Sequence, residues 1–233
     1  TDEVGRLAAS FDRMLGALAL SRAQQQRLVQ DAAHELRTPL TSLRANIEFL
    51  DRARDLPADD LDLIFSGLRD ELGELTALFD ELIQLASEPG DAAPPVPLDL
   101  AQVVAGAVER FQRRTGREVA LVSEPTVLTG SRAQLDRAVT NLLGNAHKFS
   151  PSGAPIDVSL AGRAVVVSDR GPGIEPSDQP LVFDRFYRSA SARSEPGSGL
   201  GLAIVRQIAE QHGGTVTLTE VPGGGVAVGF TVA

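Results

Sequence analysis

Asp31-Ala32-Ala33-His34-Glu35-Leu36-Arg37-Thr38-Pro39-Leu40 places one of the chain's three histidines in the middle of a strong helical pattern. From Leu36 onward, apolar residues follow at spacings of four, three, four and three, which predicts a coiled-coil seam through Leu40, Leu43, Ile47 and Leu50. His34 is two positions from both Ala32 and Leu36, which is about 200° around a helix. We therefore expect His34 to point away from the seam, toward solvent.

The neighbours of His34 add to this pattern. Glu35 is adjacent to it, and Thr38 is one turn further along on the same helix face. Pro39 removes the amide that would have bonded the Glu35 carbonyl, so we expect a bend just past His34. A proline inside a helix lowers helix stability by about 3 kcal/mol, which suggests that the bend serves a purpose but does not identify it. On these residues alone, an ordinary surface histidine on an amphipathic helix fits as well.

The composition limits the classes of function. None of the 233 residues is Cys, which excludes disulfides and thiolate metal sites, and three scattered His give no metal-ligand cluster. The net charge of −9 argues against nucleic acid as the main partner. No apolar run reaches the roughly 18 residues of a membrane span, so we expect the chain as given to be soluble. It starts at Thr1 within a helical pattern, so we expect a piece of a longer protein.

Two long helices are expected on either side of a break at residues 54–60. The first covers residues 21–53. The second covers residues 59–87 and repeats the seam spacing at Leu61, Ile64, Leu68, Leu72, Leu75, Leu78, Leu82 and Leu85. The short connection makes them an antiparallel hairpin. One hairpin cannot bury both apolar stripes, whereas two can as a four-helix bundle, so we predict a homodimer through residues 21–88; packing onto the rest of the chain is the alternative.

A linker separates this hairpin from an α/β region. Residues 89–97 contain four Pro and one Gly, which is typical of a linker. Helices are then expected after the caps Asp99 and Ser131 and again over residues 202–209, ending at Gly213. A short helix is expected between residues 168 and 197. Strands are expected at 118–123, 126–129, 156–160, 164–168, 215–221 and, after a turn at 222–225, 226–232. This order predicts a mixed sheet with helices on one face.

Four short segments of the α/β region carry chemistry, and the first is Asn141–Ser150. Asn141, Asn145 and Lys148 are spaced by four and three, so they share one helix face. Neutral amide oxygens can complete a Mg²⁺ shell built mainly from phosphate and water, and a Lys can meet phosphate as a point charge. A polar, solvated helix face is the simpler alternative.

The second and third segments follow the strand expected at 164–168. Asp169-Arg170-Gly171-Pro172-Gly173-Ile174 combines an Asp, which can accept a hydrogen bond from an exocyclic amine, with glycines that let a ring approach the backbone. A strand-ending turn is the alternative. Phe183–Arg188 mixes three aromatics with two cations, and Arg188 could reach a terminal phosphate. The alternative is a short helix that packs Phe183 and Phe186 inward.

The fourth segment, Gly197-Ser198-Gly199-Leu200-Gly201-Leu202, precedes an expected helix. Backbone amides freed by glycine at a helix start bind phosphate well. Leu202 stands where a dinucleotide-binding fold would have Gly, and no G-x-x-x-x-G-K-[ST] occurs, so neither that fold nor a P-loop fits. Residues 189–197 are polar and predict a mobile lid.

These motifs together resemble one known family. The segment from His34 to Leu40 resembles the phospho-acceptor box of the sensor histidine kinases of two-component systems. The four later segments, in this order and spacing, resemble the N, G1, F and G2 boxes of the histidine-kinase ATP-binding domain, which shares its fold class with Hsp90-type ATPases. The resemblance covers residues 20–233. It departs mildly at Phe149, where Tyr is common, and at Ala33, where Ser is common.

The resemblance implies that ATP and Mg²⁺ bind the α/β region. The Mg²⁺ ligand would be Asn145, with Asn141 in support. The other residues implied to bind the nucleotide are Lys148 and Arg188 at phosphate, Asp169 at the adenine amine, Phe149 at the adenine ring, and Gly171, Gly173, Gly197, Gly199, Leu200 and Gly201, which would shape the site.

The fold implied by the resemblance is an all-α helical hairpin, paired as a dimeric four-helix bundle, followed by an α/β two-layer sandwich of the histidine-kinase/Hsp90 ATPase type. Residues 21–88 would be the dimerisation and histidine phosphotransfer domain, 89–97 the linker and 98–233 the catalytic ATP-binding domain. Residues 1–20 resemble the last helix of a HAMP linker, which joins a membrane span to a kinase core. The chain would then be the cytoplasmic portion of a bacterial membrane protein, attached to the membrane only through segments outside this sequence.

The implied activity is ATP-dependent phosphorylation of His34, with Glu35 as general base, followed by transfer to an aspartate of a response-regulator receiver domain. Thr38 could orient water to hydrolyse the phospho-aspartate of the regulator, so a kinase that is also a phosphatase fits. Two alternatives stay open. One is a pseudokinase scaffold that binds ATP or a partner without turnover, and the other is an ATP-driven clamp of the Hsp90 type.

Overall fold

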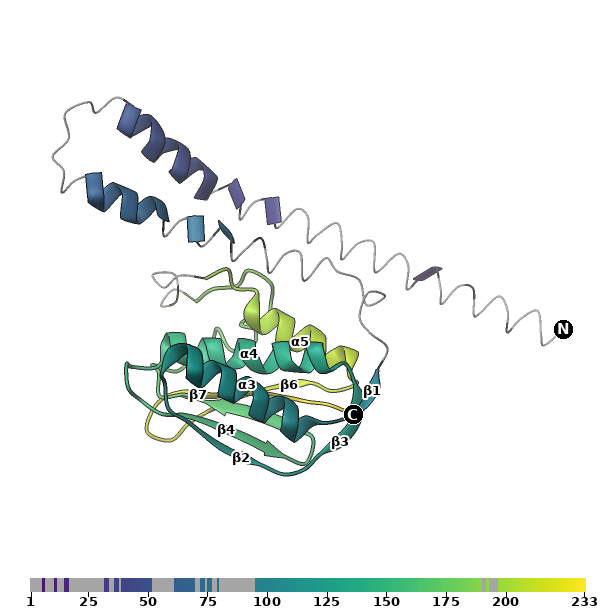
Figure 1. Cartoon of the computed structure of the whole chain (residues 1–233). Coiled ribbons are helices and arrows are strands. Elements are labelled where there is room, and N and C mark those ends of the chain that lie inside the picture. Colours follow the sequence, from purple (N-terminus) through teal and green to yellow (C-terminus); the bar gives the residue numbers. More distant parts are fainter. Residues whose placement is uncertain are drawn as a thin grey trace. The chain divides into compact units, whose positions relative to one another are not determined.

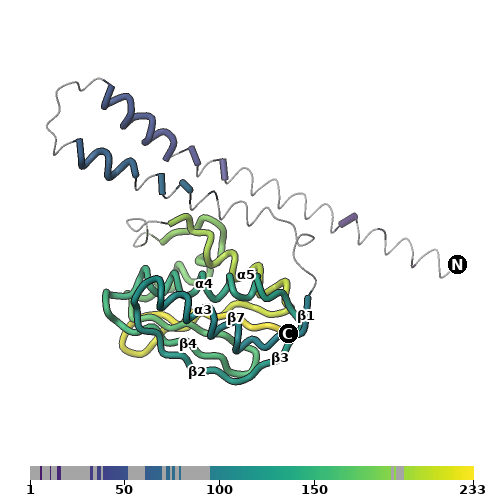
Figure 2. The backbone as a smooth tube through the Cα atoms, viewed as in Figure 1, coloured from purple at the N-terminus to yellow at the C-terminus, as the bar shows by residue number. Residues whose placement is uncertain are grey.

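The structure is a computed structural model of the chain. It divides into two compact units, Thr1–Ser87 (unit 1) and Glu88–Ala233 (unit 2), each of which is described by itself (Figures 1 and 2). The structure describes residues 6, 11, 15, 16, 32, 33, 36, 37, 39–51, 61–69, 72, 73, 75, 76, 79, 95–189, 192 and 197–233.

The described part of unit 1 is helical. Residues 39–51 and 61–69 form two helical runs, which agrees with the helices expected over 21–53 and 59–87. In the described part of the chain, no helix has the length and apolar character needed to cross a bilayer. Several predictions fall outside the described residues, namely the catalytic roles of His34, Glu35 and Thr38 and the bend after His34.

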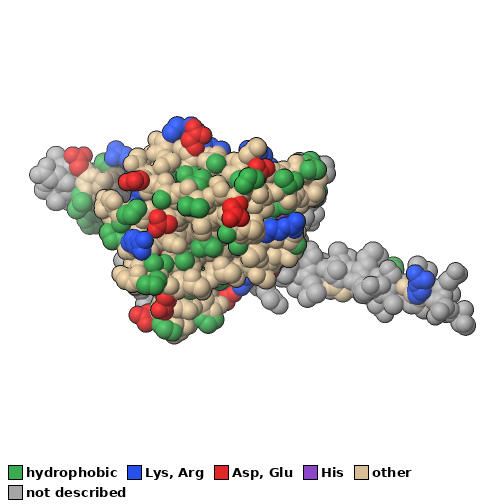
Figure 3. Space-filling view, turned by 90° about the horizontal axis from the view of Figure 1, so that it is seen from below, with side chains coloured by type: hydrophobic (Ala, Val, Ile, Leu, Met, Phe, Trp, Pro, Cys, Tyr) green, Lys and Arg blue, Asp and Glu red, His purple; other side chains and the backbone are tan. Residues whose placement is uncertain are grey.

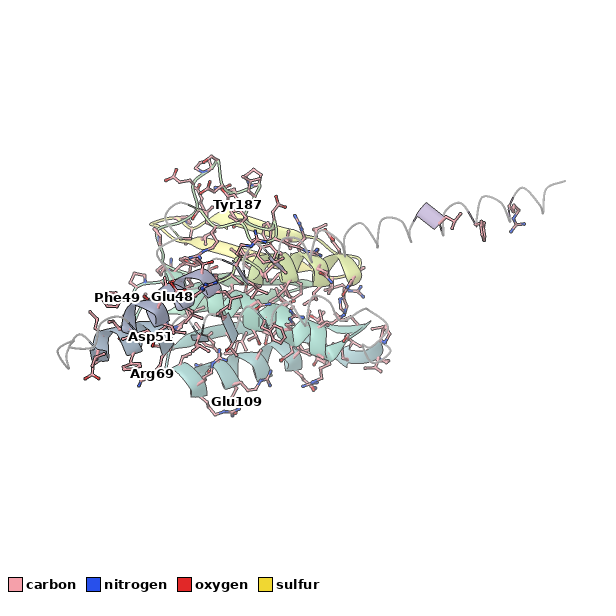
Figure 4. All side chains as sticks on the ribbon, turned by 90° about the horizontal axis from the view of Figure 1, so that it is seen from above. Glu48, Phe49, Asp51, Arg69, Glu109 and Tyr187 are labelled. Carbon is pink, nitrogen blue, oxygen red and sulfur yellow. The ribbon has the colours of Figure 1, made fainter. Side chains whose placement is uncertain are left out.

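Both helical runs of unit 1 leave large apolar side chains exposed in a single chain. Leu40 and Ile47, which belong to the predicted seam, are each 55% exposed. Phe49 on the first run and Leu63 on the second are exposed as well; Figure 4 shows Phe49 on its helix. Exposed apolar stripes of this kind favour association with another helical surface.

Unit 2 is a two-layer α/β sandwich, which confirms the predicted fold class. Its elements in chain order are β1 (Val96–Asp99), α3 (Leu100–Thr115), β2 (Val119–Ser123), β3 (Val127–Gly130), α4 (Arg132–Phe149), β4 (Ile156–Ala161), β5 (Ala164–Ser168), α5 (Gly201–Gln211), β6 (Val216–Glu220) and β7 (Val226–Thr231). Five strands form a mixed sheet in the order β2-β4-β5-β7-β6, and β1 pairs with β3 separately. In the large sheet only β2 and β4 are parallel. The helices α3, α4 and α5 lie together on one face of the sheet (Figure 1).

The strands of the large sheet alternate between a buried and an open face. Val158 and Leu160 of β4 are buried, and the register sets them opposite Val167 and Val165 of β5, which are buried too. Ser159, between them, is exposed. This two-residue period packs one face of the sheet against the helices. Figure 3 shows hydrophobic and charged side chains interspersed over the molecular face seen from below.

The helices begin and end where local signals predict. The Asp99 side chain accepts from the Ala101 amide at 3.0 Å and caps α3, and Gly116, with φ 68°, ends it. The Ser131 side chain accepts from the Gln134 amide at 3.5 Å and caps α4. Each cap satisfies a backbone group that a helix end leaves without a partner.

The connection from β5 to α5 differs from the prediction. In its described part, residues 176–183 and 185–186 form turns rather than the expected short helix. Their hydrogen bonds mix spans of three and four residues, as from the Leu181 and Val182 amides to the Asp178 carbonyl at 2.8 and 3.1 Å. Phe186 takes φ 61°, which a helix cannot contain. Phe183 is buried, as the inward-packing alternative predicts, but Phe186 is not.

Candidate functional site

The helix α4 presents two amide side chains toward the start of α5. A Cβ atom built at Gly201, the first residue of α5, would lie 3.8 Å from the amide atoms of Asn145 and 3.9 Å from Oδ1 of Asn141. Nδ2 of Asn141 is buried and has no hydrogen-bond partner among the residues that the structure describes. Such a donor costs about 1–3 kcal/mol when unpaired, so the position favours a ligand with oxygen acceptors. A neutral amide oxygen in this setting also fits a Mg²⁺ ion whose other ligands are phosphate and water.

The last turn of α4 reaches the first glycine of the 197–201 loop. Nζ of Lys148 lies over the Phe149 ring, 4.7 Å from its centroid. A Cβ built at Gly197, where φ is 139°, would come within 3.0 Å of the same Nζ. An ammonium group held here can bind phosphate as a point charge. The structure therefore brings Lys148, Phe149 and Gly197 together.

Asp169 is a buried carboxylate that follows β5 directly. It is 5% exposed. Its Oδ1 accepts from the Gly171 amide at 2.8 Å and from the Val226 amide at 3.3 Å. Since both amides bind the same oxygen, Oδ2 is left to accept a hydrogen bond from a ligand, and an amine is a suitable donor.

Opposing influences act on the charge of Asp169. Burial is the largest and raises the pKa of its carboxyl above the ordinary value. The hydrogen bonds from Gly171 and Val226, and the charges of Arg117 and Arg170, lower this pKa and offset part of the effect of burial. A carboxyl with a raised pKa at the edge of a glycine-rich loop is typical of a functional site.

Glycines allow three chain segments to meet around Asp169. A Cβ built at Gly171 would lie 2.8 Å from the Phe149 carbonyl oxygen, and one at Gly225 would lie 2.1 Å from the Asp169 carbonyl oxygen. A Cβ built at Gly173, where φ is 82°, would lie 3.8 Å from the Gly225 carbonyl oxygen. The end of α4, the loop after β5 and the β6–β7 turn therefore fit together only without side chains at Gly171 and Gly225.

A second close approach joins the two remaining segments. The Phe186 amide donates to the Gly199 carbonyl at 3.1 Å. A Cβ built at Gly199, where φ is 75°, would lie 2.8 Å from both the Phe186 carbonyl carbon and the Tyr187 carbonyl oxygen. Leu200 is fully buried and fixes the loop to the core. Figure 4 shows Tyr187 on the segment between β5 and α5.

Arg188 comes directly after this approach. Its Nη2 donates to the Ala192 carbonyl at 2.7 Å, which holds the side chain to its own segment. The expected contact of Arg188 with phosphate stays a prediction. The predicted lid at 189–197 lies mostly outside the described residues.

An ion pair anchors the 183–188 segment to α5. Nη1 of Arg206 and Oδ1 of Asp184 are 2.9 Å apart, and both side chains are partly exposed. Exchanging either charge alone (Asp184→Arg or Arg206→Asp) is expected to weaken ATP binding about two- to fivefold, because a partly exposed pair contributes at most about 1 kcal/mol. The double exchange is expected to restore most of the affinity, measured by calorimetric titration. A double variant as weak as the two single changes combined would contradict this role.

Two contributors to the site were missed by the sequence analysis. Gly225 was assigned only to a hairpin turn, although the run from Gly223 to Gly225 is a signal for close backbone approach. Arg117, whose charge acts on Asp169, follows the C-cap of α3, and no local pattern marks it.

Two family models match the chain. Residues 130–233 match the model described as histidine kinase-, DNA gyrase B-, and HSP90-like ATPase. This match defines the class of unit 2 as an ATP-binding module, and the matched range contains every candidate nucleotide-binding residue. Residues 24–89 match the His Kinase A (phospho-acceptor) domain, and this range contains His34, Glu35 and Thr38.

Similar proteins narrow the class to a family. The chain is 44% identical over 238 residues to the signal transduction histidine-protein kinase/phosphatase MprB of Mycolicibacterium smegmatis, covering 96% of this chain and 48% of that protein. MprB of Mycobacterium tuberculosis is also 44% identical, over 247 residues that cover all of this chain and 48% of that protein. The chain thus spans about half the length of these curated relatives.

Solved structures agree with this assignment. The structure of a mycobacterial sensor histidine kinase MprB has 40% identity and a TM-score of 0.55, covering 59% of this chain and 97% of that one. The Acinetobacter baumannii histidine kinase AdeS, at 22% identity, shares the fold with a TM-score of 0.61 over 86% of this chain and 97% of that one. The chain belongs to the sensor histidine kinases of two-component systems.

Proposed function

We propose that the chain phosphorylates His34 from ATP and passes the phosphoryl group to an aspartate of a response-regulator receiver domain. The observation that carries the proposal is the buried Asp169, with Oδ1 held by two backbone amides and Oδ2 left for a ligand donor. Family membership and the printed function of the MprB relatives, kinase/phosphatase, support it.

The nucleotide would be held at three points. Asp169 would accept from the adenine amine, and the Phe149 ring would stack on adenine. Lys148 and Arg188 would bind the phosphates, and Asn145, with Asn141 in support, would hold Mg²⁺. This ion would offset the negative charge that the phosphates carry. The unpaired Asn141 amide and the place of both asparagines beside Gly201 support this arrangement.

His34 would be the nucleophile. Neutral imidazole is abundant near pH 7, and one ring nitrogen attacks the γ-phosphorus of ATP. An N–P bond forms, the P–O bond to ADP breaks, and Glu35 accepts the proton from the other ring nitrogen. Transfer to the receiver domain then moves the phosphoryl group from nitrogen to a carboxylate oxygen and returns His34 to its free form.

The proposal extends to the organisation of the chain. Residues 21–88 would form the homodimer and carry His34, residues 89–97 would be the linker, and residues 98–233 would be the ATP-binding domain. The exposed apolar side chains of unit 1 support the dimer. Residues 1–20 would be the end of a HAMP linker, with a membrane segment in the parent protein.

Phosphotransfer to a panel of purified receiver domains tests the proposed function. The chain is first labelled with γ-labelled ATP and Mg²⁺, freed of nucleotide and mixed with each receiver. We expect label to leave the chain and appear on one receiver within seconds to minutes, and α-labelled ATP to give no labelled protein. A chain that takes up label but passes it to no receiver would contradict the second half of the proposal, and would favour a scaffold.

Thr38→Ala is expected to separate the two activities. Thr38 would orient the water that hydrolyses the phospho-aspartate of the regulator, so its loss should lower the dephosphorylation rate by at least about tenfold. Phosphorylation of His34 should change less than about twofold, because the hydroxyl takes no part in that step. Dephosphorylation of a purified phospho-regulator with Mg·ADP measures the effect, and Thr38→Ser, which keeps the hydroxyl, is the matched control. Equal dephosphorylation by Thr38→Ala and the unaltered chain would refute the role.

A further inference from the structure

Arg117 is a buried side chain whose hydrogen bonds have no part in the site described above. It lies between α3 and β2 and is 9% exposed. Its Nε donates to the Ala154 carbonyl at 3.0 Å, and its Nη2 donates to the Ala154 and Pro151 carbonyls at 2.8 and 2.7 Å. Its Nη1 donates to the His147 carbonyl at 3.2 Å and lies 3.3 Å from Nδ1 of the same residue. Each of the three guanidinium nitrogens therefore donates to at least one backbone carbonyl.

These acceptors belong to the end of α4 and to the turn that leads into β4. The His147 carbonyl is one of the last four of α4, which have no partner within the helix. Lys148 and Phe149 follow it directly. Pro151 and Ala154 close the turn through a hydrogen bond of 3.1 Å. The guanidinium thus ties the chain on both sides of Lys148 and Phe149 to the start of β2.

The guanidinium is also a buried positive charge without a close anion. None of the ion pairs among the described residues includes Arg117. A buried cation is costly unless an opposite charge stabilises it. The charge of Arg117 acts on the buried Asp169 and lowers the pKa of that carboxyl. Arg117 therefore favours the charged form of Asp169 through the interior of unit 2.

We propose that Arg117 is a positioning residue for the adenine end of the nucleotide site: it fixes the last turn of α4, which carries Phe149, and places a positive charge that acts on Asp169. The inference rests on the proposed function, because it presumes that the site binds ATP. Lys at this position would keep the positive charge but lose the spread of donors that the planar guanidinium provides. An ammonium has three donors on one nitrogen and cannot reach four separate acceptor atoms.

The charged and titratable groups on the elements around Asp169 are few, which makes its titration measurable. Residues 221–226 of the β6–β7 turn carry none. The groups to consider are Arg117; Arg170, which is paired with Asp157 of β4 at 3.0 Å; and His147 and Lys148 at the end of α4. His147 is the one imidazole among these, so a control must remove it.

Calorimetric titration of the full chain with ADP from pH 5 to 9 tests the proposal. At pH 8 we expect Arg117→Gln and Arg117→Lys to bind on the order of tenfold more weakly than the unaltered chain, which is about 1.4 kcal/mol. In a plot of ADP affinity against pH, the acid limb is the low-pH range in which affinity falls as Asp169 takes up a proton. This limb should move to higher pH in Arg117→Gln and stay in place in Arg117→Lys. Titration of the ADP phosphates is common to all variants and cancels in the comparison. Lower unfolding temperatures with unchanged affinity and unchanged profiles would mean a purely structural role and overturn the proposal.

Two matched variants control for nonspecific effects. Arg110→Gln removes an arginine of α3 that is paired with Asp136, and it should leave ADP affinity unchanged. His147→Asn keeps an acceptor near the guanidinium, removes the imidazole, and should leave the acid limb in place. A shifted limb in His147→Asn would assign the titration to His147 and overturn the electrostatic part of the proposal.

Hydrogen exchange on the unaltered chain keeps the test independent of variant folding. ADP is expected to slow exchange of the amides of residues 150 and 152–154 together with that of Gly171, because the Arg117 guanidinium binds the 151–154 turn and the Gly171 amide binds Asp169 at the proposed adenine site. Unchanged exchange at residues 150 and 152–154 would overturn this inference and leave the proposed function standing. Absence of ADP binding by the unaltered chain would overturn the proposed function and this inference together.

Discussion

Asp169→Asn is expected to lower the affinity for ATP by about 100-fold while leaving the chain at least as stable as before. The asparagine keeps Oδ1, so the amides of Gly171 and Val226 retain their acceptor. The other carboxylate oxygen is replaced by an NH₂ group. This group and the adenine amine would both be donors, so no hydrogen bond could form between them. Losing a hydrogen bond to a charged acceptor costs about 1.5–3 kcal/mol, and about 2.8 kcal/mol corresponds to 100-fold.

The stability effect of this change follows from the pKa of Asp169. Burial raises the pKa in the folded chain above the unfolded value, which is about 3.9. The carboxyl therefore contributes stability that is fully present below the unfolded pKa and is lost as the pH rises through the folded pKa. The asparagine does not titrate, so the unfolding temperature of the variant relative to the unaltered chain should improve as the pH rises from about 4 to 7.

Calorimetric ATP titration and thermal unfolding at several pH values measure both effects of Asp169→Asn. Asp157→Asn is a matched control, because it removes a half-exposed carboxyl from the neighbouring strand β4 and breaks only the ion pair with Arg170. It should bind ATP within about twofold of the unaltered chain. Unaltered ATP affinity in Asp169→Asn would remove the basis of the proposed adenine site.

Gly199→Ala is expected to lower the rate of His34 phosphorylation by about 100-fold. The added methyl would lie 2.8 Å from backbone atoms of Phe186 and Tyr187, so the 183–188 segment and the 197–201 loop must separate. A displacement on the order of 1 Å in a positioned site can cost about 100-fold in rate. The positive φ of 75° adds strain of roughly 1–2 kcal/mol.

A comparison with Gly162→Ala separates backbone strain from close approach. Gly162 also has a positive φ, of 57°, but nothing lies within 4 Å of its built Cβ. Its substitution should lower stability by roughly 1–2 kcal/mol and leave phosphorylation unchanged. Label incorporation and thermal unfolding are measured on both variants. Similar phosphorylation rates in the two would contradict the view that the Phe186–Gly199 contact shapes the site.

The regular elements of unit 2 could be predicted because local signals decide them. Asp99 and Ser131 cap the helices that follow, and the alternation from Ile156 to Leu160 gives β4 with the predicted face buried. In these stretches, intrinsic preference, capping and burial all favour the same structure. The candidate residues on α4 could be predicted for the same reason, since helical spacing fixes which side chains share a face.

The parts that could not be predicted depend on contacts between distant segments. In the turns at 176–186, where a short helix was expected, the Phe186 amide bonds the distant Gly199 carbonyl and Phe186 has a φ of 61°, which a helix cannot contain. Gly225 and Arg117 act on Asp169 from positions 56 and 52 residues away in sequence (225 − 169 and 169 − 117). No local pattern says on which distant residue such a group acts, so only the folded structure reveals it.

Incubation with γ-labelled ATP and Mg²⁺ is the most direct test of the central claim, that a nucleotide bound in unit 2 phosphorylates His34. The unaltered chain, His34→Gln and Asp169→Asn are compared, and the label is treated with acid and with alkali. We predict label on the unaltered chain only, lost in acid and retained in alkali, as a phosphoramidate requires. Undiminished label on His34→Gln would contradict the account.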